Sequence, residues 1–286
     1  MTDFPRVPRL DPAETLRELA VVTGLRLAYD GPCPGGEVGA AYVRWPRGHR
    51  SVLTTMPPGT LAGARRIESL ITAARAAGVP APRYELLQEL PSCVAVVQEL
   101  LPGSVPDPAG RRTVESMVEL NARCRGLLAG EPGPGAPLYL RTDGPGFCLH
   151  GPLSGYSAAT AQLLAEVELI GAMATDRLPG DDLVHFDYHP GNVLTDAAGT
   201  VTGVVDWDGA GRGNGYFDLA ALRFDLARTA PELGRWLGGQ LRGTVPEELA
   251  LACWAHLSLR LVDWSIRHKT APYVENWLGI ARELHP

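Results

Sequence analysis

The stretch from Leu183 to Asp208 constrains the possible folds of this chain more than any other part of the sequence. Its pattern predicts two short apolar strands, each followed directly by polar residues. Asp187 and Asn192 are separated by four residues, and Asp206 follows the second strand, beyond a polar turn at residues 196–199. We therefore expect three groups that handle protons or metal ions to converge.

These groups match the needs of phosphoryl transfer. The reaction uses a carboxylate to accept the proton of an attacking hydroxyl, and an amide oxygen with a second carboxylate to hold Mg²⁺ on the nucleotide phosphates. The spacing His-x-Asp-x-x-x-x-Asn, from His185 to Asn192, is that of the protein-kinase catalytic loop. Asp206 lies 14 residues further on, where those enzymes have a metal-binding aspartate.

A transition-metal site is the alternative for this stretch. Residues two apart on a strand share a face, so His185, Asp187 and His189 could bind one metal ion. The Pro190-Gly191 pair breaks such a strand, however, and Asp206 would have no role. Phosphoryl transfer accounts for more of the residues.

The amino-acid sequences of three segments point to a family. His185-Phe-Asp-Tyr-His-Pro-Gly-Asn192, then Val205-Asp-Trp-Asp208, then Asp218-Leu-Ala220 closely resemble the aminoglycoside phosphotransferase and choline kinase-like enzymes, which are small-molecule kinases with the protein-kinase fold. The resemblance implies that Asp187 is the base or orienting carboxylate and that Asn192 and Asp206 bind Mg²⁺. It also implies that His185 organises the loop from beneath and that Asp218 supports the loop backbone. Phe186 stands where the family commonly has glycine, so we expect it to shape the loop.

The same resemblance implies an α+β, two-lobed protein-kinase-like fold. The N-lobe would span residues 1–101, with a small antiparallel five-stranded sheet and one main helix. The C-lobe would span residues 102–286 and be mostly helical. Sequence patterns agree: a helix capped by Asp11 should end at Gly24, and four helices should follow Leu219, at residues 220–229, 231–241, 246–267 and 273–284. A strand is expected at 25–29, a helix at 111–128, and a long loop at 130–156 that either lines the substrate cleft or is disordered.

Two segments of the N-lobe are candidates for nucleotide binding. Glycines 35, 36 and 39 lie between two expected strands, where backbone amides can approach phosphates. Without the downstream loop, a plain surface turn would be as good an interpretation of Gly35, Gly36 and Gly39. The hinge between the lobes would read the adenine edge through Gln98, Glu99, Leu100 and Leu101, although a plain buried strand fits the same apolar run.

One expected residue is missing from the N-lobe. Kinases place a lysine on the third strand to hold the phosphates, but Lys269 is the only lysine here. Thr54, or its neighbour Thr55, occupies the position, and Glu68 lies in the middle of the helix that should carry the lysine's partner. Arg44 or Arg50 is a candidate substitute, because arginine binds phosphate in a bidentate fork. The alternative is that both are exposed turn residues.

The substrate pocket has no motif of its own. In the family, acidic side chains of the C-lobe attract cationic groups, and the candidates here are Asp181, Asp182, Asp225, Asp263 and Glu275. Each could equally be an ordinary exposed carboxylate. We expect the tryptophans of the last helices to pack in the core.

Composition narrows the class of protein. With 286 residues and 45% hydrophobic content, the chain can bury a substantial core. Its net charge of -6 argues against a nucleic-acid partner and suits a small cationic substrate. The five cysteines contain no Cys-x-x-Cys pair, and no apolar run is long enough for a membrane span, so we expect a cytoplasmic protein, as a monomer or weak dimer.

These observations predict an enzyme that moves the γ-phosphate of ATP or GTP, with Mg²⁺, to a hydroxyl of a small cationic molecule. An antibiotic is the leading substrate, either an aminoglycoside or a basic cyclic peptide, and phosphorylation would give resistance by inactivation. The first alternative is a metabolite kinase for an amino alcohol or a sugar. The second is a catalytically silent nucleotide-binding or regulatory protein, suggested by the absent lysine.

Overall fold

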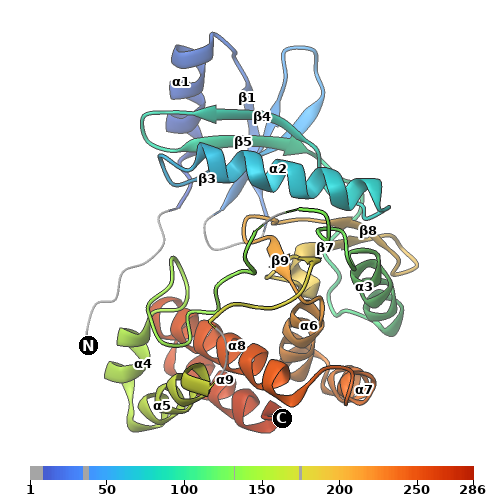
Figure 1. Cartoon of the computed structure of the whole chain (residues 1–286). Helices are drawn as coiled ribbons and strands as arrows, with labels where there is room; N and C mark the ends of the chain where they lie inside the picture. Colours follow the sequence, from blue (N-terminus) through green and yellow to red (C-terminus); the bar gives the residue numbers. More distant parts are fainter. Residues whose placement is uncertain (1–8, 35–38, 132, 174–175) are drawn as a thin grey trace. The chain divides into compact units, whose positions relative to one another are not determined.

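The computed structural model describes residues 9–34, 39–131, 133–173 and 176–286. The chain divides into two compact units. The first, which we call the sheet unit, contains Val7–Pro106 and Gly191–Ala210. The second, the helical unit, contains Asp107–Pro190 and Gly211–Pro286. Figure 1 labels the helices and strands of both units.

The sheet unit is built on an antiparallel sheet of five strands in the order β1-β2-β3-β5-β4, which confirms the expected sheet. Alternate residues of β5 enter a buried cluster with Val43 and Leu53, as the period of two along a strand requires. The first strand begins at Ala28 and not at Leu25, because residues 25–27 lead in from the preceding helix. The strands are β1 (Ala28–Cys33), β2 (Ala40–Arg44), β3 (Arg50–Met56), β4 (Tyr84–Glu89) and β5 (Val94–Glu99).

Two helices accompany this sheet. In α1 (Pro12–Thr23), the Asp11 carboxylate accepts the N–H groups of Ala13 at 3.0 Å and Glu14 at 3.1 Å, and Gly24, with φ 73°, ends the helix, as predicted. Leu19 of this helix packs in the buried cluster that contains Val43 and Leu53. The helix α2 (Leu61–Ala76) packs against β4 and runs along the sheet in Figure 1.

A hairpin of β7 (Val193–Thr195) and β8 (Val201–Val204) also belongs to the sheet unit. Its strands pair antiparallel, with Val193 opposite Val204. The N–H of Val204 donates to the carbonyl of Pro80 at 2.7 Å, and the hydroxyl of Thr202 donates to that of Pro102, also at 2.7 Å. The segments just before β4 and just after β5 therefore hold the hairpin. A 3₁₀ turn, Pro190–Asn192, leads into it.

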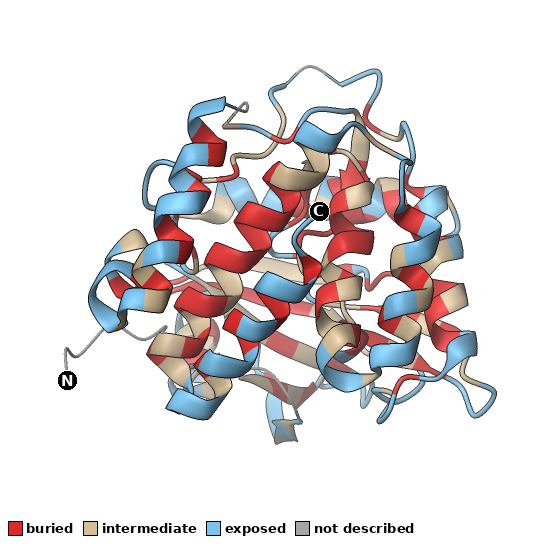
Figure 2. Cartoon of the chain, turned by 90° about the horizontal axis from the view of Figure 1, so that it is seen from below, coloured by how far each residue is buried: buried red, intermediate tan, exposed pale blue. Residues whose placement is uncertain are grey.

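The helical unit packs around α8, most of whose residues are buried. Figure 2 shows this burial on the sides where the helices meet, with exposed residues outside. Trp254 and Trp277 lie in this core, as predicted, whereas Trp236 and Trp264 are half-buried outside it. The four expected C-terminal helices are present. The helices are α3 (Arg111–Arg123), α4 (His150–Tyr156), α5 (Ala158–Met173), α6 (Tyr216–Thr229), α7 (Pro231–Leu241), α8 (Glu247–His268) and α9 (Ala271–Leu284).

Three features of this unit differ from the predictions. The helix α3 ends at Arg123, five residues before Leu128. The helix α4 lies within the expected loop 130–156, because burial of Leu153 outweighs the poor helix propensity of its glycines and proline. The glycine-rich segment after Asp208, for which no strand was predicted, forms β9 (Gly211–Gly213), which pairs antiparallel with β6 (Asp182–Val184).

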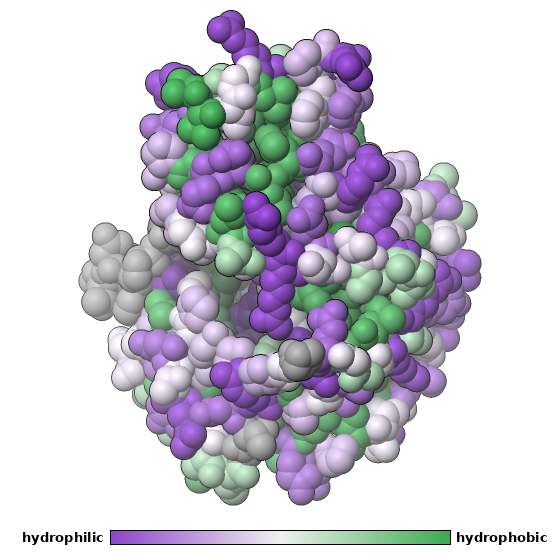
Figure 3. Space-filling view, turned by 45° about the horizontal axis from the view of Figure 1, so that its top comes forward, coloured by the Kyte–Doolittle hydropathy of each residue, from purple (hydrophilic) through white to green (hydrophobic). Residues whose placement is uncertain are grey.

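No helix among the described residues is long and apolar enough to cross a membrane. On the face drawn in Figure 3, hydrophilic residues are interspersed with hydrophobic ones.

Candidate active site

The loop after β6 is held from below by Asp218 of α6. The Asp218 carboxylate accepts the N–H of His185 at 2.8 Å and the N–H of Phe186 at 2.9 Å, and all three residues are buried. Desolvation raises the pKa of Asp218 to about 7, although both N–H donors favour the charged form. Asp218 thus lies where the resemblance expected a support for the loop backbone.

His185 and Tyr188 fasten the loop from inside. The Nδ1 atom of His185 accepts the N–H of Asp187 at 3.3 Å, and its ring lies 5.8 Å from that of Tyr188. The Tyr188 hydroxyl donates to the carbonyl of Met117 on α3 at 2.8 Å. Among the described residues, no group of three or more His, Cys, Asp or Glu side chains is arranged to hold a metal ion.

Phe186 has a left-handed backbone conformation, with φ 66°, which costs about 1–2 kcal/mol for a non-glycine residue. Its ring packs against Phe217 at 4.7 Å, and its carbonyl accepts a hydrogen bond from Arg260. The conformation turns the chain between His185 and Asp187. These contacts stabilise a turn that the family commonly makes with glycine.

Asp187 has two partners with positive character. Its Oδ1 atom lies 2.9 Å from Nη2 of Arg260 on α8, and its Oδ2 atom lies 3.7 Å from Nε2 of His189. Desolvation would raise the pKa of Asp187, but Arg260, His189 and His185 outweigh it and hold the pKa well below its usual range. The side chain is 35% exposed. Asp187 is therefore an anionic acceptor within reach of a ligand.

Two carboxylates act electrostatically on His189. Desolvation lowers its pKa, but the hydrogen bond and charge of Asp187 and the charge of Asp225 on α6 raise it overall. Asp225 itself accepts hydrogen bonds from Arg228 at 3.0 Å and from the Thr229 hydroxyl at 3.2 Å. The substrate candidate Asp225 thus acts electrostatically on this loop.

Asn192 and Asp206 come together through the hairpin of the sheet unit. Because Val193 pairs with Val204, the residues just outside this pair lie at the same end, and the N–H of Val205 donates to the Asn192 carbonyl at 2.9 Å. Asp206 follows directly, with φ 64°. Amide and carboxylate oxygens suit a hard cation such as Mg²⁺, so this donor set fits the metal that the family implies.

Tyr84 was missed by sequence reasoning. This buried residue of β4 hydrogen-bonds Asp208, and desolvation together with the charges of Asp208, Asp206 and Glu68 raises its pKa well above the usual range. Desolvation also raises the pKa of Asp208, against the hydrogen bond from Tyr84. The tyrosine thus contacts the predicted metal loop through Asp208 and lies within electrostatic range of Glu68 on α2. Nothing in the sequence of β4 indicated that Tyr84 would contact Asp208.

The other nucleotide-binding candidates lie on or near the sheet. Thr54 of β3 is half-buried and pairs with Val96 of β5. Gly39 has φ 85°, whereas Gly35 and Gly36 lie outside the described residues. Gln98 of β5 pairs with Val52 of β3 and Tyr84 of β4, and Leu100 and Leu101 follow the strand.

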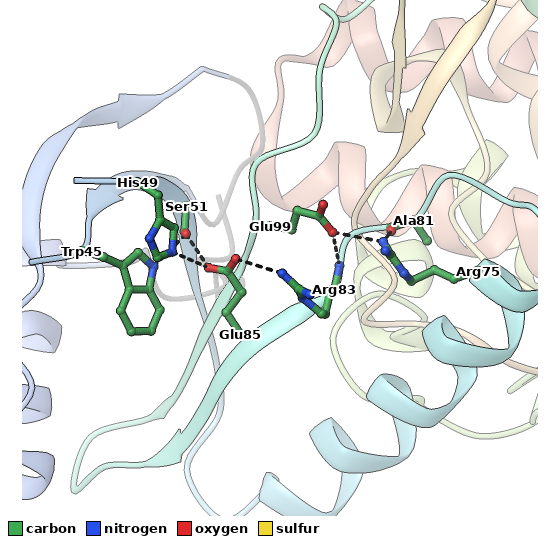
Figure 4. A network of polar contacts seen from close by, with 8 residues as sticks. All are labelled: Trp45, His49, Ser51, Arg75, Ala81, Arg83, Glu85 and Glu99. Atoms are coloured by element: carbon green, nitrogen blue, oxygen red, sulfur yellow. Dashed lines mark hydrogen bonds and ion pairs between the residues drawn. The ribbon is translucent and has the colours of Figure 1, made fainter. Parts of the chain in front are cut away.

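The side chain of Glu99 belongs to a polar network (Figure 4). Its Oε2 atom accepts the N–H of Arg83 at 3.1 Å and lies 3.0 Å from Nη1 of Arg75, which also donates to the carbonyl of Ala81. The Glu99 N–H donates to the carbonyl of Arg83 at 2.8 Å. Figure 4 also shows that Glu85 accepts a hydrogen bond from the Ser51 hydroxyl and forms an ion pair with Arg83 at 3.8 Å. These contacts brace the end of β5.

Arg44 and Arg50, the candidate substitutes for the missing lysine, share one partner. Their guanidinium groups lie 2.9 Å and 2.5 Å from Oδ2 of Asp30 on β1. Arg50 also lies over the ring of Tyr42, 4.6 Å from its centroid. Both arginines are therefore occupied by contacts within the sheet.

The remaining substrate candidates have diverse surroundings. Asp263 is fully buried against Arg267 and accepts two N–H groups, from Cys148 and Leu149, each at 2.9 Å. Asp182 accepts the N–H groups of Gly126 and Gly215, both at 2.8 Å. Asp181 is half-buried and Glu275 is exposed.

Sequence reasoning also missed Arg260. The available signal was a single arginine among apolar residues, Leu257-Ser-Leu-Arg-Leu-Val262, where a buried charge needs a partner. No pattern along the chain named that partner, because 74 residues separate Arg260 from Phe186.

Comparisons with known proteins agree with this architecture. The structure is similar to a thermostable mutant of the aminoglycoside phosphotransferase APH(4)-Ia, with TM-score 0.67 and 18% identity, over 94% of this chain and 97% of that one. It is also similar to a microcompartment-associated aminopropanol kinase, with TM-score 0.63, 17% identity and 95% of each chain covered. The macrolide 2'-phosphotransferase MphH from Brachybacterium faecium matches with TM-score 0.55 and 20% identity, over 94% of this chain and 97% of that one.

Comparison with curated proteins found no match to this sequence. The model of the phosphotransferase enzyme family, in contrast, matches residues 32–255, which contain the loop after β6, the hairpin and most of the helical unit. The similarity in fold confirms the two-lobed kinase-like prediction, and the family match confirms the resemblance stated from the sequence. This chain belongs to the phosphotransferase enzyme family.

Proposed function

We propose that this protein transfers the γ-phosphate of ATP or GTP to a hydroxyl of a small cationic molecule, with an antibiotic as the leading substrate. One observation carries the proposal. The Asp187 carboxylate is held in its anionic form by Arg260. Five residues later, Asn192 lies at the end of a hairpin and is hydrogen-bonded there to the segment that contains Asp206. Family membership makes phosphoryl transfer the matching reaction. The substrate would be an aminoglycoside or a basic cyclic peptide.

In this proposal Asp187 accepts the hydrogen bond of the substrate hydroxyl and aligns its oxygen with the γ-phosphorus. The new O–P bond forms as the bond to the departing nucleoside diphosphate breaks, and the hydroxyl proton passes to the Asp187 carboxylate. Asn192 and Asp206 would hold Mg²⁺, which when bound neutralises charge on the phosphates. The backbone around Gln98–Leu101 would contact the nucleotide base, with the Glu99 side chain bracing the strand.

Structural neighbours support a nucleotide co-substrate and a small acceptor. Variants of APH(4)-Ia are known in ternary complexes with hygromycin B and either ADP or AMP-PNP, and a phosphotransferase from Streptomyces rimosus with ADP and streptomycin. The two APH(4)-Ia variants replace an aspartate and an asparagine that are five positions apart in that enzyme. Asp187 and Asn192 have the same spacing.

A metabolite kinase is the second candidate. The aminopropanol kinase and a putative fructosamine-3-kinase from Haemophilus somnus share the fold, with TM-scores of 0.63 and 0.59. Both names describe acceptors that combine an amine with hydroxyl groups. An amino alcohol or an amino sugar would meet the same requirement for a cationic acceptor. A silent nucleotide-binding protein is the third candidate, because Thr54 replaces the lysine of β3.

Nucleotide consumption by the purified protein tests the proposal. ATP or GTP with Mg²⁺ would be offered with basic antibiotics, amino alcohols and sugars, and the product analysed for a phosphate ester. Asp187→Asn should abolish turnover. Asp196→Asn is the matched control, because this carboxylate lies in the turn between β7 and β8 and asparagine can accept the same N–H groups.

Turnover with one compound, lost in Asp187→Asn and kept in Asp196→Asn, would establish the kinase and its substrate class. If no compound is phosphorylated although nucleotide binds, the silent interpretation replaces the proposal.

A further inference from the structure

We infer that Arg260 is the positioning residue for Asp187: its guanidinium group sets the orientation of the carboxylate that receives the substrate hydroxyl. The inference rests on the proposed function and assigns a new role within it. Arg260 lies outside every sequence motif of the site, on α8 of the helical unit.

One guanidinium group holds two adjacent parts of the loop. Its Nη2 atom lies 2.9 Å from Oδ1 of Asp187, and its Nη1 atom donates to the carbonyl of Phe186. A planar fork with both donors engaged restricts the backbone and the side chain of the loop together. A lysine ammonium has no such fork, so it could supply the charge without the geometry.

The guanidinium group is itself held in place by its helix. One turn before Arg260, Nδ1 of His256 lies 2.7 Å from the carbonyl oxygen of Leu138, and its ring packs on Phe217 at 5.2 Å. On the other side of Arg260, Asp263 and Arg267 bind the segment that contains residues 146–149. Contacts on both sides of Arg260 thus fasten α8 to the rest of the unit, and the Arg260 side chain is only 21% exposed.

The charges around Asp187 explain why an arginine is needed there. His185 and His189 of the loop, Asp218 of α6 and Arg260 of α8 all act on Asp187, and Asp225 of α6 acts on His189. The arginine guanidinium is permanently charged, whereas an imidazole carries a charge only when it is protonated. Without Arg260, Asp187 would lie near other carboxylates with only histidines to balance them, so its pKa should rise.

The test compares Arg260→Gln and Arg260→Lys with Arg282→Gln, which changes an exposed arginine on α9. With the substrate found above, Arg260→Gln should lower kcat by about tenfold to a hundredfold, because the acceptor is misplaced, and leave KM for the nucleotide unchanged. The acid limb of the rate profile should move to higher pH. Arg260→Lys should keep the acid limb near its original pH but recover only part of kcat, and Arg282→Gln should match the wild type.

A second readout needs no substrate. Carbon NMR of the aspartate carboxyl groups, assigned with Asp187→Asn, should show the pKa of Asp187 rising in Arg260→Gln and staying unchanged in Arg282→Gln. A shift in this signal without turnover by the wild type would leave the contact in place and reject only the proposed activity. An unchanged Asp187 signal, or an unchanged kcat and acid limb in a folded Arg260→Gln, would overturn the role of Arg260.

Discussion

Replacing Asp263 with alanine should destabilise the protein without changing the substrate site directly. Asp263 and Arg267 are buried, with side-chain exposures of 0% and 3%. Oδ1 of Asp263 lies 2.8 Å from Nε of Arg267, and Oδ2 lies 3.0 Å from Nη2. Oδ2 also accepts the N–H groups of Cys148 and Leu149, so one carboxylate joins α8 to the segment before α4.

The size of this loss of stability follows from the groups that stay buried without a partner after the substitution. Removing one partner of a buried ion pair costs about 3–5 kcal/mol, because the other charge stays buried without compensation. The N–H groups of Cys148 and Leu149 also lose their acceptor, which places the cost toward the upper end of that range. At about 2–4 °C per kcal/mol for a chain of this size, the melting temperature should fall by about 6–20 °C.

Thermal and urea unfolding of Asp263→Ala would measure this cost. Glu275→Ala is the matched control, since it removes another acidic substrate candidate from an exposed position and should change stability by less than about 0.5 kcal/mol. Combining a leucine at position 263 with a methionine at 267 should recover much of the loss, because it removes both charges. If Asp263→Ala unfolds like Glu275→Ala and instead raises KM for the substrate, the structural role is wrong and Asp263 is a substrate ligand.

Three further changes test other parts of the structure. Asp218 ionises near pH 7 when folded and near 3.8 when unfolded, so its contribution to stability should fall as the pH rises from about 4 to about 7, and the pH dependence of the unfolding free energy should lose this component in Asp218→Asn. At Gly103, with φ 110°, a Cβ atom would lie 2.5 Å from the hydroxyl oxygen of Thr202, so Gly103→Ala should cost about 1–3 kcal/mol in urea unfolding. Gly110→Ala, which meets no atom within 4 Å, is the comparison. Phe186→Ala and Phe186→Gly both lose about 3–5 kcal/mol of packing, but glycine should be more stable than alanine by about 1 kcal/mol because φ is 66°, and equal stability would refute the strain.

Much of the fold followed from local signals. Asp11 and Gly24 mark the ends of α1, and Pro231 and Pro272 lie in the first turns of α7 and α9, where proline is tolerated. Such signals involve only a few neighbouring residues, so they can be recognised in the sequence without knowledge of the tertiary structure. They failed for α4, where glycine and proline argue against a helix and burial of Leu153 decides the outcome.

For the candidate site too, some features could be predicted from the sequence and others could not. The proximity of Asn192 to the segment of Asp206 could be expected from the sequence, because a short hairpin with Val193 opposite Val204 brings these near neighbours together. The sequence also showed that Asp263 and Asp182 carry negative charges, but it did not show which N–H groups bind them. Both carboxylates accept N–H groups from segments that lie at least 33 residues away.

The sequence by itself predicted the chemistry that we propose for this protein, because the spacing within one loop and one hairpin indicates a carboxylate acceptor and two oxygen ligands. Only the tertiary structure decided which charges surround them. Arg260 reaches Asp187, and Tyr84 reaches Asp208, because helices and strands that are distant in the chain pack together. That packing depends on the sum of many apolar contacts, none of which leaves a local pattern in the sequence.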